Sequence, residues 1–232
     1  MLTLMGTTLA KRRESVDSDY VYETLRNRIL NGNYSVREKL IEERIASELN
    51  STRSRVRVAF LRLVDEGLLV SEPHRGVRIK EISLKEAIEI LEIRKLLEIH
   101  AAKQACRNIS ATELQRLSII LDSMGNAVSN GDFELYSKLN TSFHEIIYGA
   151  ADQMTLTNVL VSLKTKLMRY QYKIAFIPGR AANSLEEHRN IFQAISERDE
   201  ERAGEFVAQH IEHLKESIIQ NRQLLEISEG LK

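Results

Sequence analysis

Three arginines at alternate positions give the first sign of chemistry in this sequence. Arg53, Arg55 and Arg57 lie within STRSRVRVAF, which spans Ser51–Phe60. Arginine pairs in a bidentate manner with guanine O6 and N7 and also binds phosphate, so this stretch could contact DNA. Strict alternation would favour a half-buried strand with a basic face. The neighbouring residues must therefore decide between a strand and a helix.

The apolar residues in and beyond this stretch recur at helical spacing. They are Val56, Ala59, Phe60, Leu63 and Val64. Thr52 or Ser51 can accept hydrogen bonds from the first free amides, and Gly67 can end the helix. The stretch is therefore predicted to be a helix on which Arg53 and Arg57, four residues apart, share an outward face.

Three of the six histidines could bind a metal ion. His144, His188 and His210 project from the apolar stripes of three separate predicted helices, and Asn140 lies one turn before His144. A single histidine in such a place is more often a hydrogen-bonded core residue. Three of them, with the amide oxygen of Asn140, could instead converge on one cation inside a helical bundle. Two other histidines have no obvious polar partners and are assigned no role: His100 and His213.

The elements around the arginines follow a known order. Apolar residues four apart predict helices over 19–30 and 41–49, and the arginine helix follows them. After it, LLVS, the turn EPHRG and VRIKEI predict a two-stranded hairpin, in which Gly76 can take a positive φ. Three helices and a hairpin describe a winged helix-turn-helix, which we place at 17–82 after a flexible basic arm at 1–16.

The histidines require a second, all-helical part, expected at 83–232. The boxes SLKE at Ser83–Glu86, SATE at Ser110–Glu113 and SLEE at Ser184–Glu187 each precede an apolar-periodic run. The expected helices are 84–107, 112–128, 132–150, 154–176, 184–197 and 199–228, with a break at IPGRAAN. The fold class is therefore mainly α, with an antiparallel helical bundle behind the winged helix.

Composition agrees with long helices in a soluble protein. The chain has 232 residues, two prolines and 43% hydrophobic residues. Its net charge is zero, yet the part up to Lys80 holds fifteen basic and eleven acidic residues out of 33 of each. That excess favours a nucleic-acid partner for the first part. Without an apolar span or signal peptide, we expect a cytoplasmic protein with no membrane partner, and the single Cys106 is expected to be a small buried residue.

The run from Tyr22 to Lys80 resembles the DNA-binding domain of GntR-family transcription regulators. The resemblance rests on Thr52–Phe60, DEGLLV and HRGVRI, with Arg55 where the family has proline and Val58 where it has glutamate. It implies that the DNA contacts are Thr52, Arg53, Ser54, Arg55 and Arg57 on the helix, with His74, Arg75 and Gly76 at the wing.

The region from Ile90 to Leu214 resembles the FCD effector domain of the FadR subfamily, through EIRKLLE, NTSFHEII, EEHRNIFQAI and AGEFVAQHIEH. Its metal-binding members imply a divalent transition metal such as Zn, Ni or Mn, with Asn140, His144, His188 and His210 as ligands. Asn140 stands in the place of an aspartate, so weaker metal binding is expected. Arg94 could bind an effector carboxylate, or it could pair with Glu98 four residues on.

The function expected from these features is a ligand-responsive, homodimeric regulator, not an enzyme. It would act as a repressor at a double-stranded operator, switched by a small organic acid bound near the metal. The alternative is a helical metallo-enzyme acting on a small organic acid with the same histidines. HEIIY begins like a zincin motif, but Tyr148 occupies the position of the second histidine.

Overall fold

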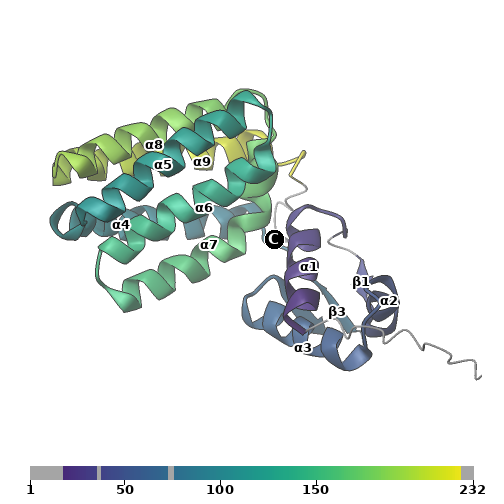
Figure 1. The fold of residues 1–232 in the computed structure, drawn as a ribbon. Coiled ribbons are helices and arrows are strands. Elements are labelled where there is room, and N and C mark those ends of the chain that lie inside the picture. The colour runs from purple at the N-terminus through teal and green to yellow at the C-terminus, as the bar shows by residue number, and fades with distance from the viewer. Residues whose placement is uncertain (1–17, 36–37, 73–75, 226–232) are drawn as a thin grey trace, which may run out of the picture.

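Where the structure describes it, the N-terminal part holds three helices and three short strands (Figure 1). A computed structural model describes residues 18–35, 38–72 and 76–225, so the expected arm at 1–16 lies outside the described residues. The elements are α1 (Ser18–Leu30), β1 (Lys39–Leu40), α2 (Glu42–Glu48), α3 (Arg53–Asp65), β2 (Leu69–Glu72) and β3 (Gly76–Ile79).

The arginine stretch is a helix, as its apolar spacing predicts. The Thr52 hydroxyl accepts from the backbone N–H of Arg55 at 3.4 Å and so caps α3. The apolar positions of α3 pack into the core of the winged helix with α1, and the chain leaves the helix through Gly67 at φ +76°. Burial of one face therefore fixes the helix and leaves the arginine face outside.

The sheet has one strand more than predicted. β2 and β3 form the expected antiparallel hairpin, and Gly76 has φ +88°, but β1 adds to the other edge of β3 to give the order β1-β3-β2. The hairpin prediction is confirmed, but it did not include β1, which contributes only Lys39 and Leu40, too few residues to show a period. Leu40 is buried in the core and holds the strand in place.

The C-terminal part is a helical bundle, as predicted. Within the described residues its helices are α4 (Leu84–Asn108), α5 (Ala111–Ser129), α6 (Phe133–Ala150), α7 (Met154–Ala175), α8 (Arg180–Ser196) and α9 (Glu200–Gln220). α4 packs along α9, and α5 packs along α6 and α8 (Figure 1). Cys106 is buried in this core, as expected. In the described ranges, no helix has the length and apolarity needed to cross a membrane.

Two predicted helix ends differ from the structure. α8 begins at Arg180, because Gly179 takes the left-handed conformation at φ +79° and starts the helix one turn before Ser184. Ser184 therefore lies inside α8 and does not cap it. α9 ends at Gln220, where Asn221 follows with a non-helical φ of −108°. Ser83 and Ser110 do cap their helices, and the Ser110 box is complete.

The two parts meet where α7 passes α1. Met168 of α7 packs against the winged-helix core, and Arg26 of α1 donates from Nη2 to the Met168 sulfur at 3.4 Å. Figure 1 shows α1 as the element of the N-terminal part beside this end of the bundle. α7 therefore contacts α1, and α3 packs on α1 in turn.

Candidate functional site

The outward face of α3 carries the predicted DNA contacts. Thr52, Arg53, Ser54 and Arg57 are exposed, while Arg55 is half-buried. The side chains of Arg53 and Arg57 are 62% and 61% exposed and lie on one face, as their spacing predicts. At the wing, Gly76 begins β3, whereas His74 and Arg75 lie outside the described residues.

One acidic residue from α2 holds this arginine pair together. The Nε and Nη2 atoms of Arg57 donate to the two oxygens of Glu42 at 2.7 and 2.8 Å, and Arg53 Nε lies 3.9 Å from Oε2. The hydrogen bonds from Arg57 lower the pKa of the Glu42 carboxyl, so it is ionised near neutral pH. Sequence reasoning missed Glu42, because its partner lies on another helix with no periodic relation to it.

The three candidate metal ligands meet inside the bundle. His144 of α6, His188 of α8 and His210 of α9 are 4%, 0% and 5% exposed. One ligand atom from each lies within 4.8 Å of the others, and the Nε2 atoms of His144 and His188 are 3.1 Å apart. The three rings therefore lie close together, as the hypothesis of a shared ion requires.

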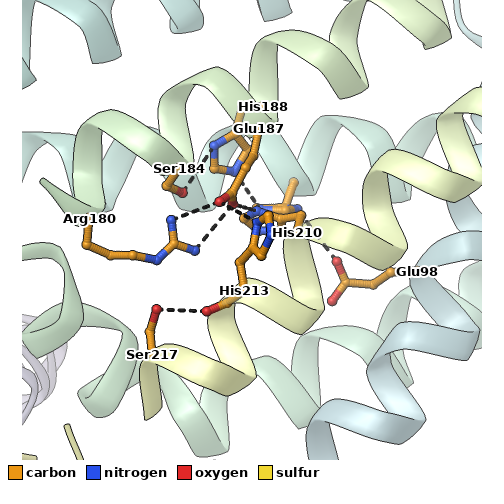
Figure 2. A network of polar contacts seen from close by, with 9 residues as sticks. Glu98, Arg180, Ser184, Glu187, His188, His210, His213 and Ser217 are labelled. Carbon is orange, nitrogen blue, oxygen red and sulfur yellow. Dashed lines mark hydrogen bonds and ion pairs between the residues drawn. The ribbon is translucent and has the colours of Figure 1, made fainter. Parts of the chain in front are cut away.

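An oxygen stands beside the Nδ1 atom of each ring. Glu187 accepts a 2.6 Å hydrogen bond from His210, Ser184 Oγ lies 3.5 Å from His188 Nδ1, and Glu98 Oε2 lies 3.7 Å from His144 Nδ1. Figure 2 shows Ser184, Glu187 and Glu98 around the labelled rings of His188 and His210. An oxygen beside Nδ1 fixes the orientation of an imidazole ring and leaves its Nε2 atom available to coordinate an ion.

Burial keeps two of these rings in the form that binds metals. It lowers the pKa of His144 well below its ordinary value, and the charges of Lys164 and His188 lower it further. Burial likewise lowers the pKa of His188, and the charge of His210 adds to the effect. Both imidazoles are therefore neutral near pH 7, and only a neutral imidazole nitrogen can coordinate a metal ion.

Two further observations indicate that the geometry of the site suits a divalent ion. Two nitrogen ligands that each lie about 2.1 Å from one ion are about 3.0–3.4 Å apart. The 3.1 Å between the Nε2 atoms of His144 and His188 falls within this range. The Oδ1 atom of Asn140 is buried, and within the described residues it has no hydrogen-bond partner. Three imidazoles and one amide oxygen suit Zn, Ni or Mn but bring no negative charge.

A small cavity adjoins these ligands. Its volume is about 40 Å³, which is room for about three waters. Asn140, His144, His210 and Arg180 line it, with Tyr136, Gln171, Ile174, Ala175, Ala181, Ser184 and Leu214. Arg180 is 10% exposed, and its Nε is buried with no partner among the described residues. Sequence reasoning passed over Arg180, because IPGRAAN was interpreted only as a break between helices.

Arg94 points inward but does not line this cavity. It is 1% exposed and binds Glu98 through Nε at 2.8 Å and Nη2 at 2.7 Å, so the alternative of an i,i+4 pair is what the structure contains. Both partners of this pair are deeply buried. Glu98 Oε2 in turn lies 3.7 Å from His144 Nδ1, so Arg94 holds the carboxylate that lies beside His144.

The two histidines to which no role was assigned both have polar partners. His213 Nδ1 lies 3.0 Å from Glu187 Oε1, and His100 Nε2 lies 3.2 Å from Gln153 Oε1. Glu187 also accepts from both terminal nitrogens of Arg180 at 3.2 Å (Figure 2). His213 thus belongs to the polar network beside the cavity, and its assignment as a residue without partners was wrong.

Comparisons with known proteins agree with both halves of the structure. The profile "Bacterial regulatory proteins, gntR family" matches residues 17–79, and the FCD domain profile matches residues 89–213. The HTH-type transcriptional repressor RspR of Escherichia coli K12 is 26% identical over 88% of this chain and 89% of its own length. The HTH-type transcriptional regulator YdhC of Bacillus subtilis 168 is 30% identical over 83% of this chain and 86% of its own. The solved structure of E. coli McbR/YncC, 24% identical, has the same fold, with a TM-score of 0.73 over 91% of this chain and 98% of that one.

A winged helix joined to a helical effector domain defines a ligand-responsive, DNA-binding transcription regulator. The chain belongs to the GntR family of bacterial regulators, in the FadR subfamily with an FCD domain.

Proposed function

We propose that this regulator is a homodimeric repressor whose affinity for its operator changes when a small organic acid binds beside a divalent transition metal. The observation that carries the proposal is the cluster of His144, His188 and His210, three buried imidazoles that each bring one ring nitrogen within 4.8 Å of the others. Buried polar groups are normally paired, so the orphaned Asn140 oxygen beside them is an argument for a ligand.

In this proposal the three histidines and Asn140 hold the ion. When bound, the ion supplies positive charge and open coordination positions for an anion. Because these four ligands are all neutral, the ion keeps its full charge, and a carboxylate would neutralise part of it. The size of the cavity, about 40 Å³, restricts the organic acid to a small molecule.

Arg180 replaces Arg94 as our candidate for the effector carboxylate. Arg180 lines the cavity and its buried Nε has no hydrogen-bond partner among the described residues, while Glu187 accepts from its two terminal nitrogens and so fixes the guanidinium plane. Arg94 binds Glu98 through Nε and Nη2, and although its Nη1 is also buried without a partner among the described residues, Arg94 does not line this cavity. A carboxylate bound there would compensate the charge of the ion and accept a hydrogen bond from Arg180 Nε, while Glu187 already offsets the charge of the guanidinium.

Two helices offer a route from this cavity to DNA. α6 and α7 line the histidine cavity with one face and, with the other, line a cavity of about 190 Å³ against α1. Asn140 lies on the first face, and the next residue, Thr141, lies on the second. A shift of this wall on effector binding would move α1, and α3 with it. A coupling of about 1–3 kcal/mol would suffice for a 5- to 150-fold change in affinity.

Two copies are needed for a specific operator. One recognition helix reads only a few base pairs, and a twofold dimer doubles the site to a short pseudo-palindrome. α4 offers a surface for the second copy, since Ile93 and Leu96 are 49% and 69% exposed on it. Light scattering should give twice the chain mass of 26.6 kDa. The protein would act in the cytoplasm, where bacterial DNA lies.

The test measures DNA affinity in the presence of metal and acid. Operator duplexes are first selected from a random pool by the protein, then titrated with chelator-treated protein, with zinc, with small carboxylates, and with both. We expect a change of about 5- to 150-fold only when zinc and one acid are present together. If no acid in a broad panel changes the affinity of the zinc-loaded protein, the effector proposal fails. Analysis of the same mixtures for consumed acid tests the enzyme alternative, which the regulators found by comparison do not favour.

A further inference from the structure

We propose that Glu42 is a positioning residue that holds Arg57 for bidentate pairing with a guanine base and keeps it from serving as a phosphate contact. The inference rests on the DNA-binding role of α3 and concerns how that helix tells one sequence from another. It begins with the carboxylate of Glu42, which lies at the start of α2 and faces two arginines of α3.

The geometry of the pair leaves one edge of the guanidinium available. Glu42 accepts from Nε and Nη2 of Arg57, which is the side edge of the group. A guanidinium has five N–H donors, so the end edge formed by Nη1 and the second hydrogen of Nη2 remains. Two parallel donors of this kind match O6 and N7 of guanine in the major groove.

The pair also sets the orientation of Arg57 in advance. A free arginine carries about 2 kcal/mol of rotamer entropy, which a base contact would have to overcome. Arg57 is 61% exposed and has little else to hold it, whereas Glu42 is 24% exposed and sits on the first turn of α2, which packs on α3. Amides at a helix N-terminus favour a carboxylate there. The less exposed Glu42 thus holds the exposed side chain of Arg57 in one orientation.

The net charge of the Arg57–Glu42 pair determines whether Arg57 is better suited to contact a base or a phosphate. With Glu42 bound, Arg57 contributes almost no net positive charge, and the carboxylate itself repels phosphate. An arginine compensated in this way is a poor counterion for the DNA backbone but keeps its hydrogen bonds for a base. Among the described residues, no acidic side chain pairs with Arg55, and Arg53 lies 3.9 Å from Glu42 at its nearest. Those two arginines are better placed to bind phosphate.

The experiment compares the base preferences of variants on random duplex DNA. Wild type, Glu42→Ala, Glu42→Gln and the control Glu48→Gln each select from the same pool, and their affinities are then measured on the wild-type site and its single-base variants. Glu48 is a suitable control because it pairs with Arg28 and Arg44 in the same domain, away from α3. Thermal unfolding of each variant verifies that the fold is kept.

We expect wild type to prefer guanine about 5- to 150-fold at one position in each half-site, as a bidentate arginine does. Glu42→Ala should reduce that preference to about threefold or less, and Arg57→Lys should reduce it equally, because lysine cannot pair in the bidentate manner. On random DNA, Glu42→Ala should bind at least as well as wild type, with a salt dependence steeper by about one phosphate. Glu48→Gln should keep the guanine preference.

Two outcomes would overturn the inference. If Glu42→Ala keeps the guanine preference and strengthens all DNA binding equally, Glu42 only competes with DNA for Arg57. If Arg57→Lys keeps the preference, Arg57 does not read the base. A wild-type protein that selects no sequence at all would instead refute the operator binding on which the inference rests, so the two failures are distinguishable.

Discussion

At the scale of single residues, the unusual member of the proposed ligand set is Asn140. Its amide oxygen is buried without a partner beside three histidines, so a carboxylate at the same place would face the ion directly. Asn140→Asp should tighten zinc binding by about 10- to 100-fold, because it adds a negative charge to a neutral ligand set. A competition titration against a chelator measures this. The control His188→Gln should weaken binding, and equal or weaker binding by Asn140→Asp would mean that residue 140 is not a ligand.

The buried histidines also make stability depend on pH. The folded-state pKa values of His144 and His188 lie below the ordinary value, so the unfolded chain binds more protons under about pH 6.5. Their contribution is therefore complete above about pH 6.5 and is lost as the pH falls toward the folded pKa values. Urea unfolding of the metal-free protein should show a decrease of about 1.4 kcal/mol per pH unit for each of the two protons. His188→Gln should remove one proton from this slope.

At the scale of elements, the start of α8 places three residues of the site. Gly179 at φ +79° sets the register that brings Arg180, Ser184 and His188 onto the side of the cavity. Gly179→Ala should destabilise the protein by about 1–2 kcal/mol, because an alanine pays for the left-handed conformation although its Cβ would meet no atom. Gly149→Ala is the matched control, since Gly149 is helical and equally open. It should be neutral or stabilising by about 0.5–1 kcal/mol in the same urea titration, and a loss equal to that of Gly179→Ala would show that conformation is not the cause.

The elements also show what the sequence could predict. The apolar spacing of α3 and the stripes of α6, α8 and α9 were enough to place the arginines outside and the three histidines inside, because one helix determines its own faces. Glu42, Arg180 and Glu187 were missed for the converse reason. Each acts on residues of another helix or of another turn, and such pairings depend on helix packing and on the exact start of α8.

At the scale of the whole molecule, Met168 is one of the side chains that connect the two parts. It lies on α7, packs against the winged-helix core and accepts from Arg26, while Gln171 and Ile174 of the same helix line the histidine cavity. Met168→Ala should therefore leave the affinities for zinc and acid unchanged. It should reduce the free energy by which zinc and acid change operator affinity by at least half, because α7 biases α1 through the contacts between the two helices. The measurement is the operator titration with and without zinc and acid.

The control for this variant is Met154→Ala, at the start of the same helix, where the side chain is 80% exposed. It makes the same chemical change on α7 at a position far along the helix from the junction with α1. If both variants keep the full response, the signal does not pass through the junction of α7 and α1, and rearrangement between two copies of the chain becomes the better account. If only Met168→Ala loses the response while its metal and acid affinities persist, binding and transmission are separate properties of α7.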